Sequence, residues 1–362
     1  MAPKRKTFQQ VANLAGVSLA TVSRVANGSA RVRPEVLQRV KEAAVKLGVD
    51  LYRQSKANVI AFLLCNRDLL HPFHSRVLVG AEAHCAAHNY NMLFMSLRYS
   101  PTVPWRELYL PPILQRREVV RALIVAGVNS QNFLDLLDHK TIAFTILGNN
   151  VIGPWHPEKY DVVWFDDIQG GYEATHYLQS LGHRDIWFVG NYRLPWFARR
   201  YEGYRRRMEE VGLTPQQAGI ESGSEQEVGY LATKSILVQK KPVTAIFTGS
   251  DSAAEGTYRA LRDFGLRTPE DVSVVGFNDI EAAMLHPPLT TVRVFSEQVG
   301  QHLADLLLRG LAHPELPPQH FTIPTQLVKR ESCRPLGRAE VDLGEETPGT
   351  GGRGAAGVSQ VI

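Results

Sequence analysis

The stretch VANLAGVSLATVSRVANG, residues 11–28, decides the fold of the N-terminal part of this chain. Apolar residues recur at helical spacing on either side of Gly16, and glycine can adopt the left-handed conformation that ends a helix and permits a sharp turn. Ser18 belongs to the residue types that cap the start of a helix. The pattern therefore predicts two short helices joined by a tight turn, which is the spacing of a helix-turn-helix.

The residues around this stretch extend it to a three-helix head. Thr7 and Gln10 have the spacing of a capping box, which predicts where the first helix starts. Pro34 stands where a third helix can begin, and Gly48 stands where it can end. We predict a helix-turn-helix domain over residues 1–50. The alternative is an ordinary helical hairpin.

The second helix of such a head enters the major groove of DNA. We expect Leu19 and Ala20 to touch base edges and Arg24 to donate to guanine. Phosphate contacts that set the register of the head are predicted for Thr7, Ser18, Thr21, Ser23, Asn27 and Arg31.

Positive charge is concentrated in the head. Residues 1–60 hold eleven Lys and Arg against three Asp and Glu, a balance of +8, so the remainder carries −4 within a total of +4. A basic module on a mildly acidic body is typical of a phosphate-binding domain attached to a separate sensor. The alternative is a basic arm that serves only solubility.

The stretch at residues 11–28 resembles the head of the lactose-repressor/galactose-repressor family over its whole length. The resemblance continues to about residue 335 through HPF at 71–73, GHR at 182–184, PEDVSVVGF at 269–277, PLTTV at 288–292 and LVKRES at 327–332. It implies a transcriptional repressor with a two-lobed, periplasmic-binding-protein-like α/β sensor. The implied effector is a sugar or sugar derivative that changes the affinity for operator DNA.

The periodicity of the body agrees with that architecture. From residue 59 onward, β-branched and aromatic runs alternate with helical stretches, which predicts parallel sheets covered by helices in two lobes, with a break near residue 160. Ligands of such sheets bind at the carboxyl ends of the strands. Strands are predicted at residues 59–64, 91–97, 122–127, 142–147, 162–166, 186–190, 245–250 and 273–277.

The family resemblance implies an effector site in the body, which we place over residues 59–335. Phe165 matches the aromatic residue on which a sugar ring stacks, and Arg200 matches the guanidinium that clamps polar groups of the ligand. Asn278 stands where the family often has Asp. The full predicted set is Phe73, Phe165, Trp196, Arg200, Ser250, Asp251 and Asn278. Without the resemblance, Phe165 is equally well a core residue, and the Arg-rich segment around Arg200 reads as a solvated helix face.

Residues 51–58 form a linker that is about six residues shorter than the hinge of the resembling family, by alignment of the two sequences. The customary Pro and Leu of that hinge are missing too. Leu51 is one candidate to replace the Leu that wedges into the minor groove. The other interpretation is that DNA binding depends more than usual on the major groove.

An enzyme and a transport-type solute-binding protein are the competing classes. The sequence has no phosphate loop, nucleophile elbow, clustered Cys/His ligands or dinucleotide glycine fingerprint, so we predict no catalytic residues, no metal site and no cofactor. A solute-binding protein is expected to carry a secretion signal where this chain has its head. A regulator that answers to a non-sugar ligand or a partner protein is a further alternative.

Several expectations concern the whole molecule. No run approaches the roughly 20 apolar residues that span a bilayer, so we expect a cytoplasmic, nucleoid-associated protein without a membrane partner. Because one head makes few base contacts, a homodimer on a palindromic operator is predicted. Residues 336–362 are Gly-rich with little apolar periodicity, which predicts a disordered tail.

Overall fold

The computed structural model describes residues 7–26, 32–49, 51, 58–67, 72–222 and 224–336. The predicted tail lies outside these residues except for Leu336, whose amide donates to Leu181 O at 2.8 Å. None of the described helices is long and apolar enough to cross a membrane.

The head is a bundle of three helices, α1 (Phe8–Ala15), α2 (Leu19–Ala26) and α3 (Pro34–Leu47). Val11, Val22 and Val40 are fully buried at its centre. Gly16 ends α1 with a φ of 66°, which is the left-handed conformation that the turn requires. Ser18 Oγ accepts a hydrogen bond from the amide of Thr21 at 3.2 Å and so caps α2. The local signals in the sequence predicted these elements correctly.

The first and last residues of the predicted linker, Leu51 and Asn58, each contact one of the domains that the linker joins. Leu51 is 4% exposed and packs in the core of the head, so the head extends one residue beyond the predicted boundary. This position disagrees with a role for Leu51 as a wedge in the minor groove, because its side chain is buried in the core of the head. Asn58 O accepts from the amide of Asn91 at 2.7 Å, which attaches this residue to the body. Residues 52–57 lie outside the described part.

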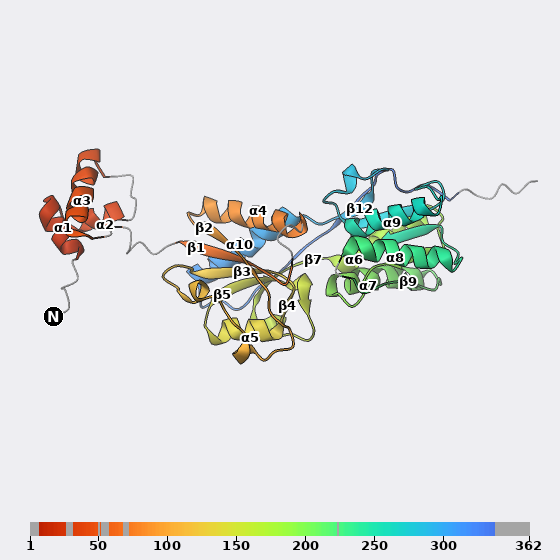
Figure 1. Cartoon of the computed structure of the whole chain (residues 1–362), viewed down its shortest axis with the longest axis horizontal. Helices are drawn as coiled ribbons and strands as arrows, with labels where there is room; N and C mark the ends of the chain where they lie inside the picture. The colour runs from red at the N-terminus through yellow and green to blue at the C-terminus, as the bar shows by residue number, and fades with distance from the viewer. Residues whose placement is uncertain are drawn as a thin grey trace, which may run out of the picture.

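The body consists of two lobes, each built on a six-stranded sheet (Figure 1). The N-terminal lobe has the strand order β13-β7-β5-β3-β1-β2, with all neighbours parallel. Helices α4 and α10 cover one face of this sheet, and α5 covers the other. The elements are β1 (Val59–Cys65), α4 (Pro72–Ala87), β2 (Asn91–Leu97), η2 (Trp105–Glu107), η3 (Pro112–Gln115), β3 (Ala122–Gly127), β4 (Asn129–Ser130), α5 (Gln131–His139), β5 (Ala143–Leu147), η4 (Gly148–Asn150), β6 (Val151–Ile152), η5 (Pro157–Lys159), β7 (Asp161–Phe165), α10 (Ser296–Ala312) and β13 (His320–Ile323).

The C-terminal lobe has the strand order β14-β12-β11-β10-β8-β9. Helices α6 and α7 pack on one face, and α8 and α9 pack on the other. The edge strand β14 pairs antiparallel with β12, so this sheet is not purely parallel as predicted. The elements are α6 (Asp167–Ser180), β8 (Ile186–Val189), α7 (Pro195–Glu210), β9 (Gln216–Ala218), α8 (Glu225–Val238), β10 (Ala245–Thr248), α9 (Asp251–Asp263), β11 (Ser273–Asn278), η6 (Ala282–Met284), β12 (Thr290–Arg293) and β14 (Gln326–Val328).

The chain crosses between the lobes three times: after β7, between β12 and α10, and between β13 and β14. The first crossing follows Phe165, close to the predicted break near residue 160. The two-lobed architecture with mainly parallel sheets is confirmed, and each of the eight predicted strands is present. The sequence pattern missed β4, β6, β9, β12, β13 and β14, which are short strands of two to four residues.

Candidate functional site

A cleft between the two lobes gathers most of the predicted effector residues. Its N-lobe side contributes the aromatic rings of Phe73 and Phe165, and its C-lobe side contributes Arg200 and Asn278. The complete lining is Arg67, Phe73, His74, Asn150, Phe165, Trp196, Arg200, Glu225 and Asn278. Five of these nine residues were predicted from the sequence.

The aromatic side chains form the apolar part of the cleft. The ring centroids of Phe73 and Phe165 lie 5.6 Å apart at a tilt of 57°. Phe73 lies in the first turn of α4, and Phe165 is the last residue of β7. The packing of the helix on the sheet brings the two rings together. Trp196 faces them from the first turn of α7 in the other lobe. Such rings offer flat faces on which a ring-shaped ligand can stack.

Arg200 is the most tightly held polar group of the cleft. It is 3% exposed; its Nε donates to Asp167 Oδ1 at 2.8 Å and its Nη2 donates to Asn278 Oδ1 at 3.2 Å. Its Nη1 donates to Gly249 O at 2.5 Å, and its Cζ lies 3.9 Å from the ring centroid of Phe277. Four contacts fix the guanidinium, so this residue is not part of the solvated face of α7.

Asp167 anchors this network from the start of α6. It is 1% exposed and also accepts from Arg199 Nε at 3.0 Å and from Asn149 Nδ2 at 2.8 Å. Its neighbour Asp166 has a different role, because its carboxylate accepts from the amide of Gln169 and caps α6. The two carboxylates point to different partners, so they do not face each other as a general acid and base pair would.

Two glycines let α6 and α7 approach closely enough for this network to form. A Cβ on Gly203 would lie 2.0 Å from Ile168 O, and a Cβ on Gly171 would lie 2.3 Å from Arg200 O. Any larger residue at either position would push the helices apart. The pair therefore positions Asp167 opposite Arg199 and Arg200.

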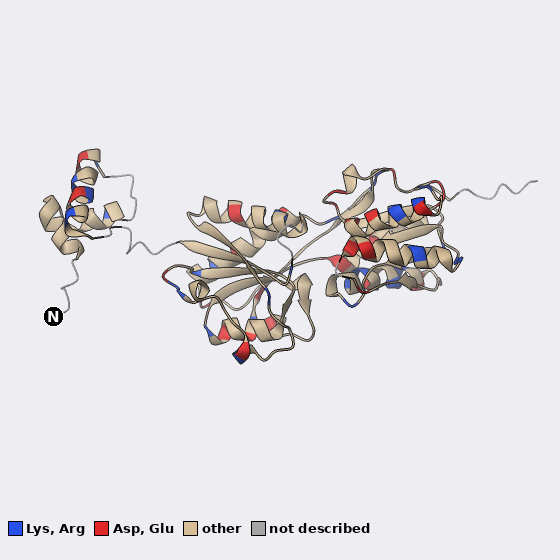
Figure 2. Ribbon diagram, in the orientation of Figure 1, with Lys and Arg blue, Asp and Glu red and all other residues tan. Residues whose placement is uncertain are grey.

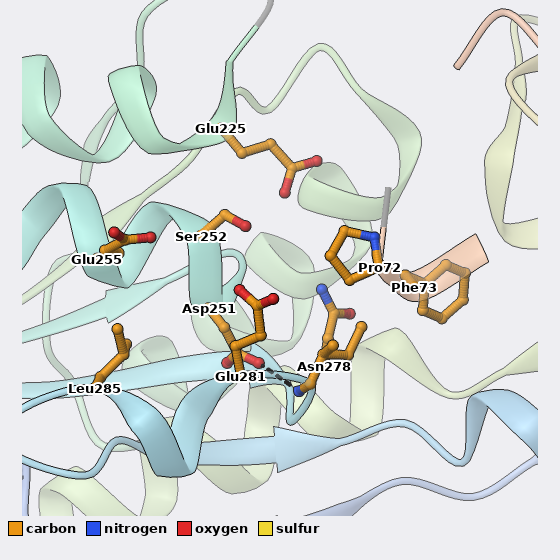
Figure 3. Close-up of a pocket in the computed structure, with 10 residues that line it drawn as sticks. Pro72, Phe73, Glu225, Asp251, Ser252, Glu255, Asn278, Glu281 and Leu285 are labelled. Carbon is orange, nitrogen blue, oxygen red and sulfur yellow. Dashed lines mark hydrogen bonds between the residues drawn. The ribbon is translucent and has the colours of Figure 1, made fainter. Parts of the chain in front are cut away.

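Ser250 and Asp251 are not among the residues that line this part of the cleft, unlike the other five predicted effector residues. Ser250 does not line the cleft; it is 1% exposed and caps α9 by accepting from the amide of Ala253. Asp251 lines a connected part of the cleft beside Asn278 and Glu225 (Figure 3). Its carboxylate accepts from the Thr291 hydroxyl at 2.6 Å and from the Ile280 amide at 3.0 Å. A direct ligand contact from Ser250 disagrees with this geometry, whereas Asp251 holds the turn that presents Asn278.

That turn has an unusual backbone. Asn278 and Asp279 have φ values of 113° and 56°, which residues with a Cβ rarely adopt. Asp279 is fixed by Arg293 and Arg330, each at 2.7 Å. Strained conformations of this kind persist where the surrounding structure holds them, and they gather at functional sites.

We expect Asp251→Asn to flatten the pH dependence of stability between about pH 4 and pH 7. Burial raises the pKa of the Asp251 carboxyl from 3.8 to about 7, against the opposing effect of its hydrogen bonds to Thr291 and Ile280. The folded protein then holds a proton that the unfolded chain releases. The stabilisation is complete below pH 3.8 and is lost as the pH rises towards 7. Urea unfolding over this pH range measures the slope, with Asp263→Asn at the exposed end of α9 as the control. Equal slopes for the wild type and Asp251→Asn would contradict the assignment.

Four lining residues escaped the sequence analysis. Arg67 and Asn150 follow β1 and β5, so the rule that ligands bind at the carboxyl ends of strands points to both. His74 adjoins the predicted Phe73, and its Nε2 lies 3.1 Å from Asn150 Nδ2. Glu225 begins α8, and no local signal places it near Arg67, which is 158 residues away in the sequence.

The candidate DNA interface is the outer side of α2. Leu19, Ala20, Ser23 and Arg24 are exposed there, while Val22 and Val25 face the core. Thr7 and Ser18 are exposed at the starts of α1 and α2, and Thr21 is half-buried beside Ser18. The predicted contacts Asn27 and Arg31 lie outside the described residues. Lys and Arg residues occur on the helices of the head (Figure 2).

Comparisons with known proteins agree with both parts of the chain. The profile described as bacterial regulatory proteins, lacI family, matches residues 7–49, and a periplasmic binding protein-like domain matches residues 175–333. The HTH-type transcriptional repressor PurR of Vibrio cholerae serotype O1 is 31% identical over 342 residues, which cover 91% of this chain and 98% of that protein.

Solved structures show the same arrangement. The complex of the transcriptional regulator CelR with cellobiose is 27% identical, has a TM-score of 0.67, and is matched over 91% of this chain and 100% of its own length. The lac repressor dimer bound to operator and the anti-inducer ONPF is 22% identical with a TM-score of 0.71 over the same shares, a likeness of fold. The chain belongs to the lacI family of bacterial regulatory proteins, as a DNA-binding transcriptional repressor with a ligand-binding domain.

Proposed function

We propose that this repressor binds its operator as a homodimer and that a ring-shaped effector, a sugar or sugar derivative, controls the affinity by binding between the lobes. The observation that carries the proposal is the cleft itself. Aromatic rings on the N-lobe side face a buried Arg200 on the C-lobe side, three of whose five N–H groups are bonded to the protein. A carbohydrate presents apolar ring faces and hydroxyl groups, and it satisfies both sides at once.

The predicted effector contacts follow from this arrangement. Phe73, Phe165 and Trp196 stack on the ligand, and Arg200 with Asn278 bonds its hydroxyls. Because the residues come from both lobes, a ligand that contacts all of them favours one relative position of the lobes. Ligand binding therefore shifts the equilibrium between lobe positions, and with it the placement of the two heads on DNA.

The dimer is supported by an exposed surface on the N-lobe. Helix α4 has Arg76 and Glu82 as its only Lys, Arg, Asp or Glu residues (Figure 2). Its outward residue Val79 is 54% exposed. The outer side of α4 is thus poor in charge, and a contiguous apolar surface is typical of a contact between protein chains. The solved neighbour bound to operator is itself described as a dimer.

A purine base is the second candidate effector. Three aromatic side chains offer planar faces for stacking, and the Asn278 amide can both donate and accept, as the edge of a base requires. Curated relatives that match 91% of the chain include repressors named PurR.

The test uses the full-length protein and an operator obtained by selection from random duplexes. Glucose, cellobiose, ribose, hypoxanthine and guanine are first compared by thermal shift, because a ligand of the native state raises the melting temperature. Fluorescence anisotropy then measures operator affinity with and without each ligand that binds. We expect one sugar to bind and to change operator affinity at least fivefold.

Two variants locate the effector. Arg200→Lys keeps the charge but loses the fork of donors, so effector affinity is expected to fall about tenfold or more. Arg205→Lys is the matched control on the same helix, since among the described residues Arg205 forms its ion pairs with Glu202 and Glu209 at the surface. Equal affinities in the two variants would place the effector elsewhere, and a sedimentation profile of monomers on operator DNA would contradict the dimer.

A further inference from the structure

Arg67 connects the two lobes across the cleft. It follows β1 in the N-lobe, and its guanidinium carbon lies 4.3 Å from the ring centroid of Trp196 in the C-lobe. Its Nη2 lies 3.3 Å from Glu225 Oε1 at the start of α8. The side chains of Arg67 and Glu225 are 17% and 12% exposed, so this ion pair is largely shielded from water.

Arg67 has an N–H group that is not used in a hydrogen bond within the described part of the chain. Its Nε is buried, and no acceptor among the described residues bonds to it. The bond to Glu225 is single and long at 3.3 Å. Arg200, by contrast, uses all three of its nitrogens. A buried N–H without an acceptor is costly, and a guanidinium presents paired donors that match an oxyanion.

The stacking on Trp196 orients this group. An arginine laid on an indole face keeps its N–H groups in a plane parallel to the ring, with the edge available to a ligand. Among the residues that line this cleft, Arg67 and Arg200 carry positive charge and Glu225 carries negative charge. Asp167, behind Arg200, pairs with both Arg199 and Arg200. Acidic residues Asp251, Glu255 and Glu281 line the connected part of the cleft, so the positive charge that a ligand meets is local to Arg67 and Arg200.

We propose that the effector carries an oxyanion, a carboxylate or a phosphate, which binds the paired donors of Arg67 and displaces Glu225. This inference rests on the proposed function, since it names the chemical class of the ligand of the same cleft. Displacement breaks the contact between Arg67 and α8, so the same group that is recognised also changes how the lobes are held. Figure 3 shows Glu225 reaching into the cleft opposite Pro72 and Phe73.

The experiment compares each neutral compound with its acidic counterparts on the full-length protein. The probes are glucose, glucuronate and glucose 6-phosphate; adenosine and AMP; and inorganic phosphate alone. By titration calorimetry, at least one acid is expected to bind tenfold or more tightly than its neutral parent. Glucuronate and the two phosphate esters separate a carboxylate from a phosphate. Inorganic phosphate is expected to raise the melting temperature of the wild type more than that of Arg67→Gln.

Two variants with opposite expected effects on the affinity for the acid distinguish ligand recognition by Arg67 from a purely structural ion pair. Arg67→Gln is expected to lower the affinity for the acid about 10- to 100-fold and to lower that for the neutral parent by a much smaller factor, since Arg67 also lies over Trp196. Glu225→Gln is expected to raise the affinity for the acid several-fold, because the competing carboxylate is gone. A purely structural ion pair would lower both affinities in both variants. Arg106→Gln is the matched control, since Arg106 lies over Trp105 at 5.2 Å, away from the cleft lining.

The two proposals fail in different ways. If neutral sugars bind, change operator affinity and are unaffected by Arg67→Gln, the proposed function stands and the oxyanion is ruled out. If neither phosphate nor any acid depends on Arg67, the oxyanion is likewise ruled out. If acids bind in an Arg67-dependent manner but operator affinity does not change, the oxyanion site stands and the proposed control of the operator fails.

Discussion

Asp167→Asn is expected to destabilise the body by about 3–5 kcal/mol, the usual cost of removing one partner of a buried ion pair. The substitution keeps the shape of the side chain and removes its charge. Arg200, which is 3% exposed, then retains a full positive charge in a low-dielectric site with only a carbonyl and an amide as acceptors. Arg199 loses the same partner. Urea unfolding followed by tryptophan fluorescence measures the change.

The neighbouring carboxylate is the matched control for this prediction. Asp166→Asn keeps a good cap for α6, because Asn accepts from the Gln169 amide as Asp does, so a change below about 0.5 kcal/mol is expected. Effector binding is expected to weaken in Asp167→Asn, since Arg200 loses its anchor, and to stay unchanged in Asp166→Asn. Equal destabilisation by the two variants would refute the ion network as the centre of the site.

Val22→Asp is expected to abolish specific operator binding, with a loss of about 10³-fold or more, the typical gap between specific and non-specific binding. Val22 has no exposed surface and lies in the core of a head formed by three short helices. An unpaired carboxylate at that position has no hydrogen-bond partner and prevents the head from folding. Fluorescence anisotropy with the selected operator measures the loss.

The body provides an internal check on the second prediction. Its melting temperature and its effector binding are expected to match those of the wild type, because its core is separate from that of the head. Val45→Asp introduces the same charge at a site that is 81% exposed, so it is expected to weaken operator binding only a few-fold. A head that binds the operator normally with Asp at position 22 would overturn the assigned core.

The sequence predicted elements well where the signal was local. The capping residue Ser18, the turn at Gly16 and the apolar spacing of α1 and α2 act within a few residues of each other, so they are readable without a structure. The strands that the sequence missed are short ones, such as β13 and β14, which obtain their hydrogen bonds from strands far away in the chain.

The candidate site was predictable only in part. Phe73, Phe165, Trp196, Arg200 and Asn278 line one cleft, and their contacts with an effector stay a prediction. Ser250 faces inward as a helix cap, because the amide of Ala253 needs its oxygen. The sequence shows that a residue lies at the end of a strand. It does not show to which neighbouring group the side chain of that residue forms a hydrogen bond.

The sequence by itself determined the helix-turn-helix head, the two α/β lobes and the family, because short-range capping, periodicity and motif spacing carry those features. The tertiary structure decided how the site works. Only the close packing of α6 on α7 brings Asp167 to Arg200, and only the approach of the two lobes brings Arg67 to Trp196 and Glu225. Charged groups so far apart in the chain meet because a buried charge needs polar partners to offset its lost hydration, and no local pattern records which partners it finds.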